Sequence, residues 1–277
     1  TRYERKKKEE PPPLPFSLSA LQVLAGKRYG YEPQQVLDTA QKLYEEKLTS
    51  YPRSDAEYLP VSQHKDAPKI LGNLAALDGS ELSAWAREAD AKQKSRAWND
   101  AKISAHHAII PTTVPVNLAR LSEMERNIYG LIARAYIAQF HPNYVYDQTK
   151  VEVTYHGELF AASGRTERAA GWRAMYRTGK SETEDAEKED EESAVLPPMK
   201  KGDAANYVSA DLSTRQTKPP SRFTPATLLQ GMKEIHKYVK DEAAKKMLRD
   251  VSGIGTEATR ASIIEDLIRR KFLNAAG

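Results

Sequence analysis

Apolar residues recur at helical spacing along most of this chain and alternate with polar residues over one central stretch. Ser17, a residue type that often caps helices, precedes a predicted helix that runs to about Arg28 and stops at Gly30. Pro33 is favoured at a first helical position and predicts the start of a second helix. The apolar stripe of the first helix is Leu18, Leu21 and Ala25, and that of the second is Val36, Leu37, Ala40, Leu43 and Tyr44.

Three further helices are predicted from their caps and their periodicity. Ser122 and Glu125 form a capping-box pattern ahead of a long helix. Thr224 and Pro225 predict the start of another helix, and a glycine-rich turn at residues 253–255 leads into the last one. We expect this last helix to bury Ile263, Ile264, Leu267 and Ile268.

The period changes from helical to alternating in the middle of the chain. Residues 145–155 predict a β-strand, His156-Gly157 predicts a turn, and Leu159–Ala162 predicts the return strand. Further short strands are expected within Ala194–Gln216. The charged segment Thr1–Glu10 is expected to be a disordered or truncated lead-in.

These elements predict an α+β chain of several domains. Residues 1–14 are expected to be a lead-in and linker, and residues 15–142 a helix-rich domain. Residues 143–217 are expected to be an all-β segment interrupted by a disordered acidic loop at about 179–194. Residues 218–277 are expected to be a helical, winged-helix-like domain that is truncated at its C-terminus.

The charge of the chain is divided unevenly. The net charge is +4, but Ser181–Ser193 contains eight acidic residues and one lysine, so the remaining residues carry a surplus of +11. Such a surplus is compatible with binding phosphates, although many proteins carry one only for solubility. The sequence has no cysteine, no signal peptide and no apolar run near the roughly 18 residues of a membrane span. We therefore expect a cytoplasmic protein without disulfides.

Tyr51 and Arg53 are the first candidates for chemistry. Tyr51 follows the second predicted helix and precedes a proline, which favours an extended backbone. A free phenol has a pKa of roughly 10, so a nearby cation helps both to form the nucleophile and to hold an anionic substrate. Alone, the pair indicates no more than a loop. Asp55 either orients this site or, equally well, caps the following turn.

His106 and His107 are the next candidates. Adjacent side chains diverge on a helix or a strand, so the two histidines are poor ligands for one metal ion, and no metalloprotease spacing is present. One of them is expected to be structural. Near the glycine-rich turn, the main-chain N–H groups of Thr256–Ala258 form either a simple helix cap or a phosphate-binding site.

Five sequence blocks in a fixed order carry a resemblance to a known family. Together they resemble type IA DNA topoisomerases, and most closely the bacterial topoisomerase III branch, from Pro11 to Phe272. No single block is specific, but the ordered set is. The blocks are Ser17–Gln22, Tyr44–Pro60, His106–Thr112, Thr217–Thr224 and Gly253–Arg260.

The resemblance implies an enzyme that cleaves and religates single-stranded DNA through a 5′-phosphotyrosine intermediate, without ATP. Tyr51 matches the nucleophile, Arg53 the arginine that supports the scissile phosphate, and His106 the active-site histidine. On the same basis, the candidate DNA contacts are Arg222, Thr256 and Arg260.

Two departures from the family pattern limit this expectation. Pro225 stands where relatives commonly carry an acidic residue. The family's N-terminal Mg²⁺-binding (Toprim) domain is expected before this region, as are further strands of the β arch, so we expect a fragment that binds DNA weakly and cleaves little alone. The Mg²⁺ is expected outside these residues, and the oligomeric state is left open.

Three other functions compete with the enzyme. A non-catalytic module for single-stranded nucleic acid could use Tyr51 to stack on a base. A tyrosine recombinase needs a His-x-x-Arg pattern before a late tyrosine, and a relaxase needs a His-x-His metal set; neither pattern is present.

Overall fold

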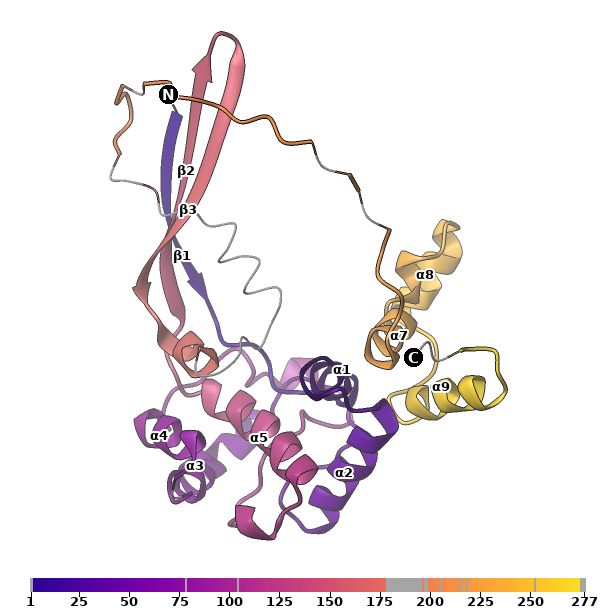
Figure 1. Cartoon of the computed structure of the whole chain (residues 1–277). Coiled ribbons are helices and arrows are strands. Elements are labelled where there is room, and N and C mark those ends of the chain that lie inside the picture. Colours follow the sequence, from indigo (N-terminus) through magenta and orange to yellow (C-terminus); the bar gives the residue numbers. More distant parts are fainter. Residues whose placement is uncertain are drawn as a thin grey trace. The chain divides into compact units, whose positions relative to one another are not determined.

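The computed structural model describes residues 2–77, 79–103, 105–177, 196, 199–204, 206–214, 216–217, 219–251 and 253–274 (Figure 1). The chain divides into two compact units, each made from two separate stretches of sequence. Unit 1 comprises Thr1–Pro12 and His141–Ser221, and unit 2 comprises Pro13–Phe140 and Arg222–Gly277. Helices together with one antiparallel sheet confirm the predicted α+β class.

Unit 1 is built on a three-stranded antiparallel sheet in the order β1-β2-β3 (Figure 1). The strands are β1 (Arg2–Glu10), β2 (Tyr144–Tyr155) and β3 (Glu158–Ala169), followed by the 3-10 turn η4 (Gly171–Tyr176). The predicted hairpin turn at His156-Gly157 is confirmed, since both residues have positive φ angles, +49° and +89°.

Two predictions for this unit are wrong. Residues Arg2–Glu10 are not a disordered lead-in, because they pair with β2 along their whole length, from Arg2 opposite Glu152 to Glu10 opposite Tyr144. A partner more than 130 residues away leaves no local signal in the sequence. The described residues of Ala194–Gln216 contain no strand. The acidic loop expected at about 179–194 lies outside the described residues.

A buried carboxylate on β2 ties all three strands together. Asp147 is 1% exposed and forms ion pairs with Arg168 of β3 at 2.8 Å and Arg5 of β1 at 2.5 Å. Hydrogen bonds from Arg168 and Arg5 hold the pKa of Asp147 below its ordinary value. The carboxylate therefore remains charged, and its ion pair with Arg5 helps to hold β1 against β2.

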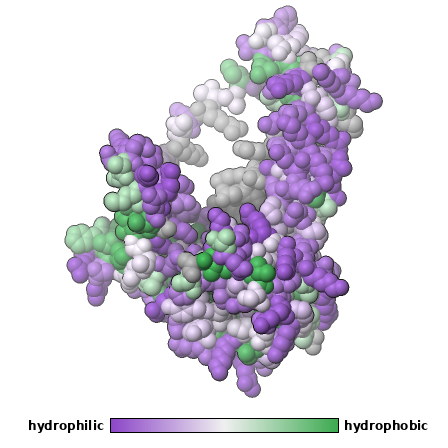
Figure 2. All heavy atoms as spheres, turned by 180° about the vertical axis from the view of Figure 1, so that it is seen from behind, coloured by the Kyte–Doolittle hydropathy of each residue, from purple (hydrophilic) through white to green (hydrophobic). Residues whose placement is uncertain are grey.

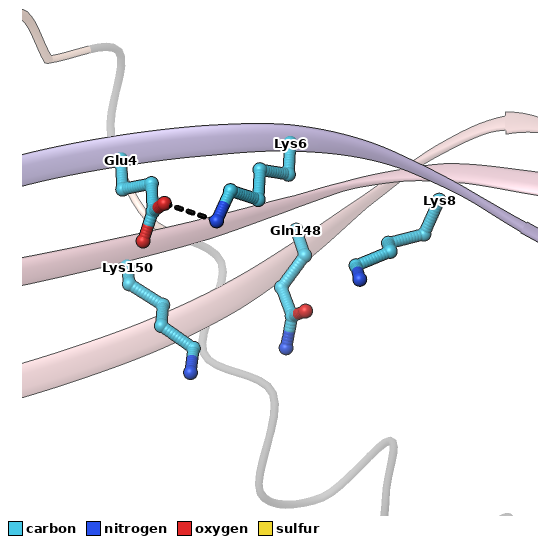
Figure 3. A pocket seen from close by; sticks show the side chains of 5 residues that line it. All are labelled: Glu4, Lys6, Lys8, Gln148 and Lys150. Atoms are coloured by element: carbon cyan, nitrogen blue, oxygen red, sulfur yellow. Dashed lines mark ion pairs between the residues drawn. The ribbon is translucent and has the colours of Figure 1, made fainter.

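Another part of the sheet forms a small pocket of about 120 Å³ (Figure 3). Its lining comes from alternate positions of β1 and β2, whose side chains share one face of the sheet. Lys6 forms an ion pair with Glu4, and Figure 3 shows this pair beside the other residues. The lining residues are Glu4, Lys6, Lys8, Gln148 and Lys150.

Unit 2 is helical, and its predicted caps are confirmed. Ser17 caps α1 and Gly30 ends it with φ +71°, Pro33 opens α2, and Ser122 with Glu125 closes a capping box on α5. The helices of its first stretch are α1 (Leu18–Tyr29), α2 (Pro33–Glu45), η1 (Val61–Asp66), α3 (Ala67–Ala75), α4 (Glu81–Glu88), η2 (Asp100–Lys102), η3 (Leu118–Arg120) and α5 (Glu123–Ala138). Those of its second stretch are α7 (Pro225–Lys233), η5 (Ile235–Lys237), α8 (Glu242–Asp250) and α9 (Arg260–Arg269).

The core of unit 2 lies around α5. Tyr129, Tyr136 and Ile132 on this helix are at most 2% exposed, and desolvation on burial raises the pKa of both tyrosines. The two stretches of the unit meet where α1 packs on α7: a Cβ added at Gly26 would lie 2.6 Å from the Cβ of Ala226. The helices can approach this closely only because residue 26 has no side chain.

The second stretch of unit 2 leaves much of its apolar surface exposed. Figure 2 shows hydrophobic atoms on the surface of this stretch, whereas the sheet of unit 1 is covered mainly by hydrophilic atoms. Ile264 is buried as predicted, but Ile268 is 38% exposed, so its predicted burial is wrong. No helix in the described part of the chain is long and apolar enough to cross a membrane.

Candidate active site

Tyr51 lies on an extended segment that follows α2. The helix ends at Glu45, and Lys47 turns the chain with φ +62°. Exposure then alternates: Tyr51, Arg53 and Asp55 are exposed, whereas the three residues between and after them are buried. Tyr51 is 37% exposed, and its hydroxyl makes no hydrogen bond to any described residue. The phenol is therefore held on a fixed backbone but is open to a ligand.

A short antiparallel pairing joins the Tyr51 segment to the His106 segment. The N–H of Ser50 donates to the carbonyl of Ile110 at 2.9 Å, and Thr112 N–H donates to the carbonyl of Leu48 at 3.0 Å. The Ser50 hydroxyl accepts from Ile110 N–H at 2.9 Å and donates to the carbonyl of Ala108 at 3.1 Å. This side chain therefore fixes the register between the two segments.

The rings of Tyr44, Tyr51 and His106 lie together. The imidazole of His106 stacks on the Tyr51 ring, with centroids 4.9 Å apart and an angle of 25° between the planes. Tyr44, near the end of α2, contacts the same ring edge-on at 5.7 Å. All three side chains are exposed. The structure therefore brings together two of the predicted catalytic residues, which are 55 positions apart in sequence.

Arg53 supplies a cation in the same segment. Its side chain is exposed, and among the described residues it has no acidic partner within ion-pair distance. A guanidinium that is not neutralised by the protein is available to an anionic ligand, and its planar fork suits a phosphate.

The structure distinguishes the two adjacent histidines. His107 is half-buried; its Nε2 lies 3.0 Å from the amide nitrogen of Gln63, and its Nδ1 lies 2.8 Å from the carbonyl oxygen of Ala108. A neutral imidazole that donates from Nδ1 and accepts at Nε2 satisfies both contacts. His107 is therefore the structural histidine, and His106 is the one beside Tyr51.

The three predicted DNA contacts have different environments. Arg222 is exposed, before α7. Thr256 is exposed, and its N–H donates to Thr259 Oγ1 at 2.9 Å, so it takes part in the turn that leads into α9. Arg260 is only 2% exposed and forms a 2.7 Å ion pair with Glu257. In this arrangement its guanidinium is not accessible to DNA.

The described residues do not fit a metal centre. Throughout that part of the chain, no three His, Asp or Glu side chains lie close enough together to hold a metal ion. Asp55 and Glu46 are the nearest carboxylates in sequence to Tyr51, and Glu57, six residues from it, accepts a hydrogen bond from Ser17 Oγ at 3.2 Å.

Three residues of the site were missed by the sequence analysis. Tyr44 was taken only as a core position, Ser50 was given no role, and Glu257 was not singled out. The spacing of Glu257 and Arg260, three residues apart near a helix start, is typical of an ion pair and was an available signal. The role of Ser50 depends on a segment about 60 residues away and had no local signal. The role of Tyr44 depends on how the chain turns before Tyr51, seven residues further on.

The chain belongs to a known class of proteins. A sequence profile described as DNA topoisomerase matches residues 1–277, and the chain belongs to this family. The particular relatives carry one name. DNA topoisomerase 3 from Vibrio cholerae is 41% identical over 274 residues, covering 99% of this chain and 41% of the relative. DNA topoisomerase 3 from Bacillus subtilis is 37% identical over 275 residues, covering 96% of this chain and 36% of the relative.

The resemblance drawn from the five sequence blocks is thus confirmed. The chain spans only about 41% of the length of relatives such as the Vibrio cholerae protein. Among solved structures, full-length topoisomerase I from Thermotoga maritima matches with a TM-score of 0.68 and 20% identity, covering 99% of this chain and 41% of that one. At this identity the match shows a common fold.

Proposed function

We propose that this chain forms the DNA-cleaving region of a longer, ATP-independent type IA topoisomerase. In this proposal Tyr51 attacks a backbone phosphate of single-stranded DNA and forms a 5′-phosphotyrosine. The stacking of His106 on an exposed Tyr51, at 4.9 Å, is the observation that supports this function best. The DNA topoisomerase 3 relatives support the substrate and the reaction class.

The reaction exchanges one phosphodiester for another. The phenolic oxygen of Tyr51 forms a bond to phosphorus and loses its proton, while the bond from phosphorus to the 3′ oxygen breaks and that oxygen takes up a proton. Religation is the reverse attack by the 3′ hydroxyl. Because the number of ester bonds is unchanged, no nucleotide hydrolysis is needed. Another strand passes through the break between the two steps.

Arg53 and His106 stabilise the charge that develops on the phosphoryl oxygens. Arg53 is placed two residues from the nucleophile and is not neutralised by a described carboxylate. His106, exposed beside the phenol, donates an N–H to the same phosphate. A positioned donor of this kind is typically worth about 10²–10³ in rate.

Other parts of the longer protein complete this site. We place the Mg²⁺ that the family resemblance implies on a separate Toprim domain, outside the residues described here. Arg222 and Thr256 are the proposed phosphate contacts of the second stretch, since both are exposed. We expect the isolated 277-residue chain to bind single-stranded DNA weakly and to form little or no covalent adduct. We also propose that the protein acts in the cytoplasm.

The proposal is tested with the full-length protein and a labelled single-stranded oligonucleotide. Wild-type protein is expected to form a covalent adduct that denaturation then traps. Tyr51→Phe is expected to form none while still binding DNA. Tyr44→Phe removes the neighbouring hydroxyl and is the matched control, which is expected to retain the adduct. An adduct that persists in Tyr51→Phe would refute the proposed nucleophile.

A non-catalytic nucleic-acid-binding module is the second candidate. The exposed rings of Tyr44, Tyr51 and His106 favour it, because bases stack on such surfaces. This function requires no hydroxyl on residue 51. A wild-type protein that binds single-stranded DNA but never forms an adduct, even with Mg²⁺, would establish it in place of the enzyme.

A further inference from the structure

The first turn of α1 has three main-chain N–H groups without partners inside the helix, and each has a different acceptor. Leu18 N–H donates to the carbonyl of Ser54 at 2.8 Å, and Ala20 N–H donates to the capping Ser17 hydroxyl at 3.4 Å. Ser19 N–H donates to a carboxylate oxygen of Glu257 at 2.6 Å. The N–H of Ser19 is thus bound by a residue from the second stretch of unit 2.

Glu257 is fixed at both of its oxygens. Oε2 accepts a hydrogen bond from the N–H of Ser19, and Oε1 accepts one from Nη1 of Arg260 at 2.7 Å. Arg260 is itself held by Ser19 Oγ at 3.2 Å, by the carbonyl of Ile254 at 3.0 Å and by that of Gly255 at 3.1 Å. Glu257 is 8% exposed and Arg260 is 2% exposed.

The charge of Glu257 suits its position. A helix N-terminus carries a partial positive charge, which favours an anion there. A buried carboxylate is tolerated when an opposite charge and further hydrogen bonds compensate for its desolvation, and Arg260 and Ser19 supply both. The pair therefore clamps the start of α1 to the turn that precedes α9.

The start of α1 also supports both parts of the active site. Leu18 N–H holds the carbonyl of Ser54, the residue after Arg53, and Ser17 Oγ donates to Glu57. Directly before the helix, the carbonyl of Phe16 accepts the N–H of Ile109 at 2.8 Å, in the segment that carries His106. A shift of this turn would therefore displace the loop of Arg53 and the strand beside His106 together.

We propose that Glu257 is a positioning residue for DNA cleavage. Held by Arg260, its carboxylate fixes the first turn of α1, and this turn aligns Tyr51 and Arg53 with His106. The inference rests on the proposed cleavage function. It gives Arg260 an indirect role in place of a contact with DNA, and it predicts that the clamp acts on the cleavage rate and leaves DNA affinity almost unchanged.

The test uses full-length protein carrying Glu257→Gln, which preserves the shape of the side chain but removes its charge. At saturating single-stranded oligonucleotide, the single-turnover rate of adduct formation is expected to fall about 10–100-fold, because small displacements of reacting groups have effects of that size. The Kd for DNA is expected to stay within about twofold of wild type. Glu265→Gln, the same change at an exposed position of α9, is the matched control and is expected to behave as wild type.

Arg260→Lys is the second variant, because lysine keeps the charge but cannot reach both main-chain carbonyls. It is expected to lower the cleavage rate by a smaller factor at unchanged Kd. All rates are measured at least about 15 °C below the melting temperature of each variant, so that global unfolding does not contribute.

Two results would overturn the inference: cleavage by Glu257→Gln at the wild-type rate, or a loss that appears entirely in the Kd for DNA. Failure of the wild-type protein to form an adduct is a separate outcome, which refutes the proposed function. The clamp and the enzyme assignment are therefore tested by different measurements.

Discussion

Replacing Ser50 by alanine tests how the nucleophile is aligned. The change removes a hydroxyl that bonds two main-chain groups, the N–H of Ile110 and the carbonyl of Ala108, and leaves the rest of the pairing intact. Ile110 is 5% exposed and Ala108 is fully buried. The carbonyl of Ala108 keeps its contact with His107 Nδ1, but the N–H of Ile110 loses its partner. Leaving a buried polar group without a partner costs about 1–3 kcal/mol.

Ser50→Ala is expected to slow cleavage as well as to lower stability. Each kcal/mol of lost stability lowers the melting temperature by about 2–4 °C. Because Ser50 is adjacent to Tyr51 and sets its register against the His106 segment, we expect adduct formation to slow by about 10–100-fold at saturating DNA. Circular dichroism measures the melting temperature, and denaturing gel electrophoresis measures the adduct.

Ser80→Ala is the control for this prediction. Ser80 caps α4 through the N–H of Leu82, and loss of such a cap costs about 1 kcal/mol. Since α4 does not carry a candidate site residue, cleavage is expected to be unchanged. The reasoning is refuted if Ser50→Ala cleaves DNA as fast as wild type, or if Ser80→Ala loses as much activity.

Three further predictions concern charge and backbone geometry. Arg53→Ala is expected to slow adduct formation by about 10²–10³ with only a small change in melting temperature, and equal rates would exclude its role. Lys42 and the Ser122 N–H lower the pKa of Glu125, so at neutral pH the melting temperature of wild type is expected to be higher than that of Glu125→Gln. This difference is expected to disappear as the pH falls below 4.5, and a difference that does not depend on pH would contradict the reasoning. Gly253→Ala is expected to be more destabilising than Gly30→Ala in urea unfolding, because both have positive φ but only the Gly253 Cβ would clash, 2.3 Å from the carbonyl oxygen of Met232.

Local features of the fold could be predicted from the sequence, and non-local ones could not. The caps Ser17, Ser122 and Thr224 and the turn at Gly157 lie where their residue types indicate, because caps and turns depend on a few adjacent residues. Residues Arg2–Glu10 were expected to be disordered because their composition is charged. Their strand depends on β2, which is far away in sequence.

The candidate site divides in the same way. Tyr51, Arg53 and His106 could be named because the order of the sequence blocks resembles a family, and the contact between Tyr51 and His106 agrees with that choice. Arg260 carried the right charge for a DNA contact, but burial was not visible in its sequence neighbourhood. Its ion pair and its bond to Ser19, 241 positions away, explain why it is enclosed.

Peptide mapping of the trapped adduct tests the central claim most directly. After nuclease trimming and trypsin digestion, Tyr44, Tyr51 and Tyr58 fall in separate peptides, residues 43–47, 48–53 and 54–65. We predict that mass spectrometry will find a 5′-linked nucleotide on the peptide of residues 48–53 alone. A nucleotide on either neighbouring peptide, or on none of the three in a protein that forms an adduct, would contradict the role of Tyr51.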